Sequence, residues 1–315
     1  MDRQIVESLS SHSRILDSTT KVRQSANRRE SPNFEGYALG EKVLLAGCGD
    51  LGLRVAQRLR QRGDTAWALR RRPPGSGQDG ITWLQGDLTV PSSLRDLPTG
   101  ITQLVYLPTP DRRDAAAYRA TFVDGLRHLL QALGGDSLRR VLFVSSSAVY
   151  GEHAGNWVDE DTPVAPPGFN GAVLVEAEQW LAARSVPSIV LRLAGLYGPG
   201  RLHLLDRLRA GSAMAPRDTP HWANRIHVDD AAAAIAHLLR LADPQPCYLG
   251  VDSMPLPLHV LYDELARLVG AQAPRPGPPP AGVGSKRLSN ARLLASGFVP
   301  CWPDSRDGYA ALIDT

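Results

Sequence analysis

The chain has 315 residues, of which 43% are hydrophobic and 21% charged, and its formal net charge is +3. This is the composition of a globular protein with one large or two smaller domains, and the charge is too small to indicate a nucleic-acid-binding protein. No apolar run approaches the roughly 18 residues that span a membrane. The distant cysteines Cys48, Cys247 and Cys301 suggest neither a disulfide framework nor a metal spacing. We therefore expect a cytoplasmic protein that binds neither nucleic acid nor membrane.

Residues 1–39 are polar and without a sustained hydrophobic period, which predicts a flexible N-terminal tail. After the tail, short apolar runs that predict buried strands alternate with amphipathic stretches that predict helices. The predicted strands cover residues 42–47, 65–70, 81–88, 101–107, 139–145 and 188–195. The predicted helices cover residues 51–63, 114–133, 172–184, 227–242 and 257–270. Such alternation indicates βαβ units and a parallel sheet.

The sequence GCGDLG lies between the first strand and the first helix and contains Gly47, Gly49 and Gly52. A GxGxxG pattern that follows a strand and opens a helix is typical of dinucleotide binding. Gly47 permits the tight turn, Gly49 lets a pyrophosphate approach the backbone, and Gly52 lets the helix pack on the strand. The free N–H groups at the start of the helix then hold the phosphate. The alternative is a plain tight turn.

Three arginines stand where an NAD site usually has an acidic residue that binds the ribose 2′-hydroxyl. The second strand ends in ALRRRP, with Arg70, Arg71 and Arg72. Guanidinium groups bind a 2′-phosphate, which a carboxylate would repel, so NADP is favoured over NAD. The alternative is a solvated basic turn. Asp87, after the third strand, is expected either to bind an adenine edge or to cap a turn. The predicted cofactor-binding residues are Gly47, Gly49, Asp50, Leu51, Gly52, Arg70, Arg71, Asp87, Leu88 and Leu107.

Five motifs resemble the extended short-chain dehydrogenases/reductases, the group of the nucleotide-sugar epimerases and dehydratases. They occur in the family's order over about residues 41–240 and are GCGDLG, GDL, VLFVSSSAVYG, LRLAGLYGPGR and NRIHVDDAAAAI. The resemblance implies an α/β fold, with a Rossmann-type doubly wound parallel sheet and a smaller C-terminal substrate lobe. We expect the NAD(P)-binding Rossmann domain over residues 40–165. Its last elements and the lobe should occupy residues 166–315.

In that family a strand-end hydroxyl orients the substrate oxygen, a tyrosine transfers the proton, and a lysine lowers the pKa of the tyrosine. The resemblance places the hydroxyl at Ser146, with Ser147 beside it. It places Asn170 at the tyrosine position and Leu174 at the lysine position. The chain thus resembles the atypical members that lack this pair. Asn170 is able to hydrogen-bond a substrate but is no base near pH 7.

A shifted alignment does not restore the pair, because residues 151–196 hold no tyrosine and residues 43–285 hold no lysine. His153 is a candidate general base, with a solvated loop histidine as the alternative. Arg192 and Arg225 are candidates for binding a substrate phosphate or for bracing loops, the two roles of such arginines in the family.

These observations predict an NADP-binding oxidoreductase or epimerase, with NAD as the alternative cofactor and a degenerate catalytic set. Its expected partner is a small sugar-like or nucleotide-linked substrate. A homodimer is one of the oligomeric states compatible with the sequence. The alternative from another class is a non-catalytic NAD(P) sensor or scaffold on the same fold. The missing pair favours the sensor, whereas the retained SSS and NRIHVDD motifs favour the enzyme. We expect no metal, because Asp229 and Asp230 at a helix start fit capping better than metal binding.

Overall fold

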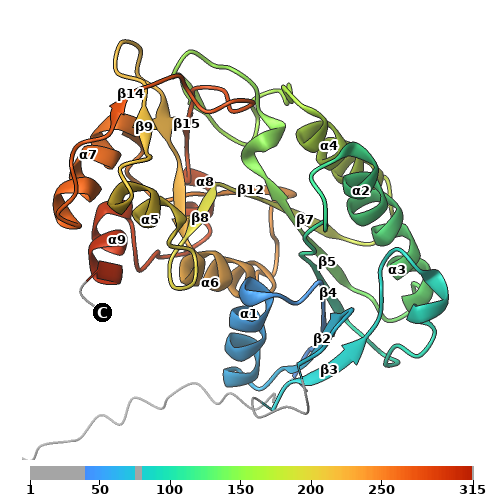
Figure 1. Ribbon diagram of the computed structural model, residues 1–315. Helices are drawn as coiled ribbons and strands as arrows, with labels where there is room; N and C mark the ends of the chain where they lie inside the picture. The colour runs from blue at the N-terminus through green and yellow to red at the C-terminus, as the bar shows by residue number, and fades with distance from the viewer. Residues whose placement is uncertain (1–39, 75–79, 314–315) are drawn as a thin grey trace, which may run out of the picture. The chain divides into compact units, whose positions relative to one another are not determined.

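The computed structural model describes residues 40–74 and 80–313, and the tail predicted over residues 1–39 lies outside this part of the chain. Within the described residues, seven parallel strands form one sheet in the order β12-β7-β5-β4-β1-β2-β3 (Figure 1). They are β1 (Lys42–Ala46), β2 (Thr65–Arg70), β3 (Thr82–Gln85), β4 (Gln103–Tyr106), β5 (Arg140–Ser146), β7 (Ser188–Leu193) and β12 (Cys247–Gly250). Because the order reverses at β1, this is the doubly wound sheet of a Rossmann-type fold, as predicted.

Helices cover both faces of the sheet, which is why its strands read as continuous apolar runs. The helices α1 (Asp50–Gln61) and α6 (Val228–Leu238) lie on one face (Figure 1). The segment 115–133 and α4 (Phe169–Ala182) lie on the other, and a short 3₁₀ turn, η1 (Pro91–Leu94), follows β3. Within the described residues, no helix has both the length and the apolar character needed to cross a membrane.

The helix expected over residues 114–133 has the predicted extent but not a uniform geometry. It consists of α2 (Ala115–Arg119), a π-helical turn η2 (Ala120–Asp124) and α3 (Gly125–Leu133). The Asp114 side chain caps α2 by accepting a hydrogen bond from the N–H of Ala117. In the π turn, the Tyr106 hydroxyl donates a hydrogen bond to the backbone carbonyl of Thr121. Such turns often occur beside functional sites.

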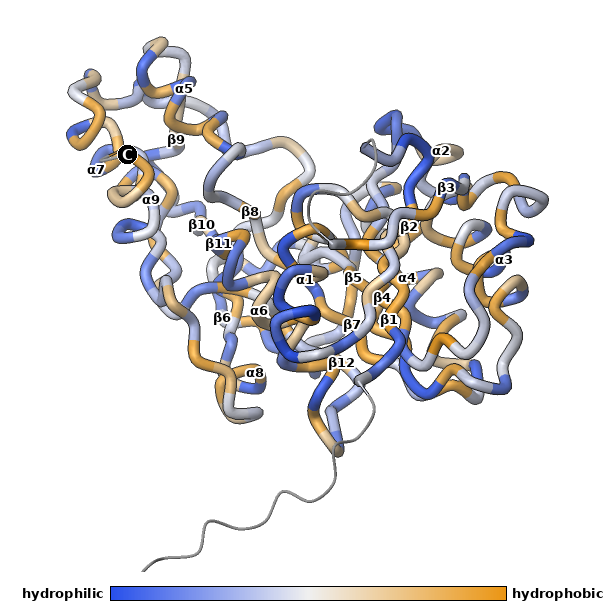
Figure 2. Tube along the Cα trace, turned by 90° about the horizontal axis from the view of Figure 1, so that it is seen from below, coloured by the Kyte–Doolittle hydropathy of each residue, from blue (hydrophilic) through white to orange (hydrophobic). Residues whose placement is uncertain are grey.

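The C-terminal elements build a second apolar core, apart from that of the sheet. Its buried members are Tyr197, Leu205, Leu208, Ala213, Ala215, Ala223, Leu258, Leu261, Tyr262, Leu265, Ala266 and Tyr309. The helices of this core are α5 (His203–Arg209), α7 (Leu258–Leu268) and α9 (Ser305–Ile313), whereas α8 (Ala291–Ala295) packs its Leu293 into the core of the sheet. Figure 2 shows α5, α7 and α9 grouped away from the sheet. The predicted domain boundaries at residues 40 and 165 remain predictions.

Four pairs of short strands lie outside the seven-stranded sheet in the described part of the chain. The pairs are β11 (Arg225–His227) with β8 (Gly195–Tyr197), β10 (Trp222–Ala223) with β13 (Leu256–Pro257), β14 (Arg275–Pro276) with β9 (Met214–Ala215), and β15 (Arg287–Leu288) with β6 (Trp157–Val158). Each strand has only two or three residues. Such short pairings are set by tertiary contacts, since runs of this length carry no period to detect.

Candidate functional site

The glycine turn (residues 47–52) joins β1 to α1, and each of its glycines meets a different steric requirement. Gly47 has φ of +83°, and a Cβ there would lie 2.3 Å from the Cα of Pro108. A Cβ on Gly52 would lie 2.9 Å from the Sγ of Cys48. A Cβ on Gly49 would meet nothing within 4 Å, so the backbone faces open space at this position. Open backbone is what the approach of a pyrophosphate requires.

The start of α1 provides the donors for an anion. Its N-cap, Gly49, has no side chain to accept from the first N–H groups of the helix, so these donors and the positive end of the helix dipole remain for a ligand. Asp50 and Leu51 line the space beside them. The Asp50 carboxylate binds Arg54 Nε at 3.0 Å and lies 3.4 Å from the Nε of Arg201, which follows β8.

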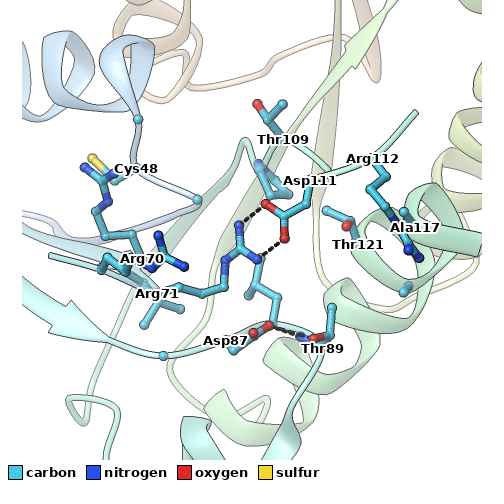
Figure 3. Close-up of a pocket in the computed structure, with 18 residues that line it drawn as sticks. Cys48, Arg70, Arg71, Asp87, Thr89, Thr109, Asp111, Arg112, Ala117 and Thr121 are labelled. Atoms are coloured by element: carbon cyan, nitrogen blue, oxygen red, sulfur yellow. Dashed lines mark hydrogen bonds and ion pairs between the residues drawn. The ribbon is translucent and has the colours of Figure 1, made fainter. Parts of the chain in front are cut away.

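A pocket of about 700 Å³ opens between the glycine turn, the ends of β2 and β3, and the segment 108–112 (Figure 3). We call it the arginine pocket. Four arginines and two aspartates line it, which makes the formal charge of its wall +2. They are Arg70, Arg71, Arg72, Arg112, Asp87 and Asp111. A concave wall of positive charge attracts phosphorylated ligands.

Arg71 reaches across this pocket to Asp111, and both of its terminal nitrogens donate to the carboxylate (Figure 3). These hydrogen bonds hold the pKa of the Asp111 carboxyl below its usual value. Both side chains are about half exposed, so water screens the pair and a ligand phosphate can compete for Arg71. Arg70 lies over the ring of Trp83, 5.9 Å from its centroid.

Asp87 caps a turn, one of the two roles expected for it, and its binding of an adenine edge remains a prediction. Its carboxylate accepts from the N–H and the hydroxyl of Thr89, at 2.8 and 2.7 Å, which is a turn-capping geometry. It also lines the arginine pocket, next to the mostly buried Leu88. Cys48 lines the same pocket, but burial raises the pKa of its thiol to about 12, so the thiol is a poor nucleophile.

A second pocket, of about 280 Å³, continues from the same turn and shares Gly47 and Gly49 with the first. We call it the leucine pocket. Its apolar side chains are Leu51, Leu107, Pro108, Phe122, Val144, Leu174, Leu193, Ala194 and Leu196. Leu174, the residue predicted to stand at the lysine position, therefore adds an aliphatic group to this wall. Among the described residues that line this pocket, Arg201 is the only cation.

Of the predicted catalytic residues, the structure brings Ser146 to the leucine pocket. Its Oγ accepts a hydrogen bond from Ala148 N at 3.2 Å and caps a short 3₁₀ turn, η3 (Ser147–Val149). Ser147 and Asn170 are not among the residues that line either pocket. Asn170 lies at the start of α4, which packs closely on the turn because Gly171 faces the carbonyl of Ala148.

The first serine of the SSS motif belongs to a buried network. Ser145 Oγ donates to Glu178 at 2.5 Å, and Arg192 forms a 2.6 Å ion pair with the same carboxylate. Arg192 also donates to the Tyr150 hydroxyl at 2.7 Å, and that hydroxyl donates to the carbonyl of Asp159. The Arg192 and Glu178 side chains are only 11% and 8% exposed, so the contacts of Arg192 favour the bracing role over substrate binding.

Arg225 and His153 lie outside both pockets. Arg225 packs against Gly195 of β8, and its buried Nε has no hydrogen-bond partner among the described residues. The N–H of His153 donates to the carbonyl of Ser285, and its ring packs edge-on against Tyr150, 6.5 Å between centroids. Their predicted roles in substrate binding and proton transfer therefore remain predictions.

The acidic pair lies in the first turn of α6, so the N-cap residue is His227 and neither aspartate caps the helix as predicted. His227 caps the helix by accepting from the N–H of Asp229, and Asp229 binds Arg54 of α1 at 2.8 Å. Asp230 accepts the backbone N–H groups of residues 301–302. Within the described ranges, no group of three His, Cys, Asp or Glu side chains is placed to hold a metal ion.

Sequence reasoning missed Arg201. It comes from a distant part of the chain, and no spacing rule connects it to the glycine turn. The signal available was its position after Gly198 and Gly200, whose φ angles of +132° and +79° form a tight loop. That loop brings Arg201 to Asp50 at the mouth of the leucine pocket.

Comparison with known proteins places the chain in a family. The profile of the NAD dependent epimerase/dehydratase family matches residues 43–248. Protein YeeZ of Escherichia coli (strain K12) is 32% identical over 247 residues, which cover 75% of this chain and 86% of YeeZ. A 3-diazoavenalumate denitrifying reductase of Streptomyces sp is 29% identical over 209 residues, which cover 59% of this chain and 68% of the reductase.

A solved structure from Methylobacillus flagellatus, grouped with the NAD-dependent epimerases/dehydratases, is 42% identical. It superposes with a TM-score of 0.75 over 87% of this chain and 98% of its own. The profile match and the identity to YeeZ carry the assignment, and the chain belongs to the NAD dependent epimerase/dehydratase family.

Proposed function

We propose that this protein is an NADP(H)-dependent oxidoreductase of a small sugar-like or nucleotide-linked substrate. The observation that carries the proposal is the glycine turn, which opens onto a positively charged pocket on one side and onto Ser146 on the other. When bound, the cofactor would supply or accept a hydride. NADP is proposed over NAD because Arg70, Arg71 and Arg72 line the pocket where an acidic residue would bind the ribose 2′-hydroxyl.

Ser146 would orient the reacting oxygen. Its Oγ accepts from Ala148 N, so its own proton is still available for a substrate oxygen. Leu174 brings no charge to the wall, and the proton must then come from water or from a group outside the pocket, such as His153. Acid–base help is worth ~10²–10⁴ in rate, so we expect slow turnover.

Reduction is favoured over epimerisation in this site. Epimerisation through a carbonyl intermediate requires one group to remove a hydroxyl proton and return it, whereas reduction needs a single proton that water can supply. The apolar lining around Leu174 offers no such two-way proton carrier. The name of the Streptomyces relative, a reductase, supports the same direction.

Calorimetry with NADPH and NADH tests the first half of this proposal. Tighter binding of NADPH is the expected result, and equal affinities would contradict the NADP assignment. The second half requires a screen of carbonyl compounds, sugars and nucleotide sugars, with turnover followed as loss of NADPH absorbance. A substrate whose turnover survives Ser146→Ala unchanged would contradict the role of Ser146.

The second candidate is a non-catalytic NAD(P) sensor or scaffold. It is favoured by Asn170 and Leu174, which replace the acid–base pair of the family. The two candidates differ in one readout. A sensor binds NADPH with the affinity measured above, turns over no compound in the screen, and responds to Ser146→Ala only in the binding of a partner.

We also propose a cytoplasmic location and a homodimer. The three cysteines are free thiols in the structure, as a reducing compartment favours. Cell fractionation tests the location. Light scattering on the purified chain decides between one copy and two.

A further inference from the structure

The C-terminal lobe contains a pocket of about 970 Å³ that shares no lining residue with the two pockets at the glycine turn. Three chain segments line it, namely residues 152–156, 216–222 and 276–287. They meet at the end of the lobe where β9, β14 and β15 lie in Figure 1. We call it the lobe pocket. It is larger than the arginine and leucine pockets, so it has room for a ligand of its own.

Hydrogen bonds tie the three segments together. Glu152 accepts the N–H of Ser285 at 2.7 Å and the N–H of Ala154 at 2.6 Å. The Ser285 hydroxyl donates to the carbonyl of Pro220 at 3.1 Å, which attaches the third segment. Prolines stiffen the wall because their φ is fixed, and they are Pro216, Pro220, Pro276, Pro278 and Pro279. The pocket is therefore preformed.

Arg287 is the distinctive side chain of this wall. Its guanidinium lies over two aromatic rings, 4.7 Å from the centroid of Trp222 and 5.0 Å from that of Trp157. Its Nε donates to the carbonyl of Gly155 at 2.7 Å. Its terminal nitrogens have no hydrogen-bond partner in the described part of the chain. Stacking occupies the face of a guanidinium and leaves its edge for a planar anion.

The second arginine of the wall is already engaged. Both terminal nitrogens of Arg217 bind the carboxylate of Asp263, at 2.9 and 2.7 Å, and one also donates to the carbonyl of Pro274. The edge that would bind a ligand anion is thus occupied. Arg287 alone of the two arginines offers unbonded donors to the lobe pocket.

The charge of the wall limits the charge of the ligand. Two arginines and two acids line the pocket, so its formal charge is zero. They are Arg217, Arg287, Glu152 and Asp218. Burial lowers the pKa of His221, which lines the same wall, so its ring is uncharged near pH 7. A diphosphate would bring two or more negative charges to a wall with one available cation. A single carboxylate matches that cation in charge and in its two-oxygen geometry.

We propose that the lobe pocket binds a carboxylate carried on a ring, with the edge of Arg287 on the carboxylate and the ring against Trp222 and the prolines. The inference rests on the proposed function, because it makes this acid part of the substrate. It narrows that substrate to a sugar acid or an aromatic acid and excludes a nucleoside diphosphate. Both acids present the same group to Arg287, and the probes separate them.

The test is calorimetry on the full chain with five probes. Benzoate and glucuronate carry the acid, benzamide and glucose are their neutral counterparts, and UDP carries the diphosphate. We expect at least one acid to bind more tightly than its neutral counterpart and than UDP. The acid that binds identifies the ring. UDP is titrated with excess NADPH present, because the glycine turn is itself a predicted site for a diphosphate. If neither acid binds, or if UDP then binds more tightly than both, the proposal is overturned.

Arg287→Met keeps the aliphatic stem and removes the charge, and we expect it to weaken binding of the acid at least tenfold. Arg275→Met is the matched control, since Arg275 is exposed in the same lobe and does not line the pocket. If Arg287→Met fails to fold, Arg287→Lys serves instead, because it keeps the charge and loses the paired donors. Unchanged affinity in the folded variant overturns the proposal.

NADPH affinity is measured on the same samples. A chain that binds NADPH and neither acid contradicts this inference alone, whereas a chain that binds an acid and no dinucleotide contradicts the proposed cofactor instead.

Discussion

The arginine pocket and the leucine pocket share one glycine turn but differ in their chemistry. The first has four arginines and two aspartates in its wall. The described lining of the second includes five leucines, Ser146, Asp50 and a single cation, Arg201. Under the proposed function, the arginine pocket would provide the affinity and selectivity for a dinucleotide. The leucine pocket would hold the reacting groups with little acid–base help. Affinity and turnover should therefore be lost through different substitutions.

The largest effect is expected on turnover, at the leucine pocket. Ser146→Ala removes the hydroxyl that orients the substrate oxygen, and loss of one such donor typically lowers kcat by ~10²–10³. Affinity for NADPH should stay within a few-fold, because the dinucleotide donors lie in the glycine turn. Turnover is followed as NADPH absorbance with a substrate from the screen. A parallel loss of NADPH affinity would break the distinction between the two pockets.

The complementary substitution pair is Asn170→Tyr with Leu174→Lys. It restores the residue types of the family at these two positions, and Leu174 already lines the pocket. We expect kcat to rise, since proton transfer would no longer depend on water. The single substitution Leu174→Met is the control, because it keeps the wall apolar. No gain in a folded, NADPH-binding double variant would contradict a vestigial dehydrogenase site.

The next effect is on binding at the shared turn. Gly49→Val should weaken NADPH roughly 100-fold or more, because the side chain takes the space of the pyrophosphate and several charge-assisted hydrogen bonds of about 1.5–3 kcal/mol are lost. The fold should be unaffected, since a Cβ at Gly49 meets nothing within 4 Å. Gly135→Val is the matched control, because Gly135 has the same free space and lies outside both pockets. Calorimetry and thermal melts check the two statements.

A smaller effect concerns selectivity at the arginine pocket. Wild-type protein should bind NADPH more tightly than NADH by roughly 1–3 kcal/mol, the worth of hydrogen bonds between charged groups. Arg70→Ala with Arg71→Ala should remove most of this gap and leave NADH affinity nearly constant. Arg95→Ala, an exposed arginine outside the pocket, is the control. If the double variant still prefers NADPH to NADH by the same margin, residues other than Arg70 and Arg71 determine the selectivity.

The smallest effect is expected at Arg201. The Arg201 side chain is partly exposed, so water would screen an ion pair between it and the cofactor. Such a pair should contribute about 0.2–1 kcal/mol, or a few-fold in NADPH affinity. Arg201→Met should lower that affinity and reduce its dependence on salt, since one cation near the phosphates is removed. Arg209→Met, on the exposed side of α5, is the control. Unchanged salt dependence would show that Arg201 does not reach the cofactor.

The sequence by itself determined six strands of the sheet, its helices and the glycine turn, because each depends on neighbouring residues. It did not predict the edge strand β12, whose four residues are too few to show a period. Apolar runs such as Lys42–Ala46 predict buried strands wherever the chain places them. The spacing of Gly47, Gly49 and Gly52 is fixed by the covalent chain, so the motif can be recognised without the tertiary structure. The predicted absence of the tyrosine and lysine pair also rests on the sequence alone, since it needs only the residue types at two aligned positions.

Only the tertiary structure decided which charges are available. Arg71 and Arg192 look alike in the sequence, but Arg71 lies in an exposed ion pair with Asp111 and Arg192 in a buried one with Glu178. The stacking of Arg287 between Trp157 and Trp222 likewise joins residues from distant segments. Local patterns carry no information about such contacts. The charge that a side chain offers to a ligand depends on its partners and its burial, and both are set only when the chain folds.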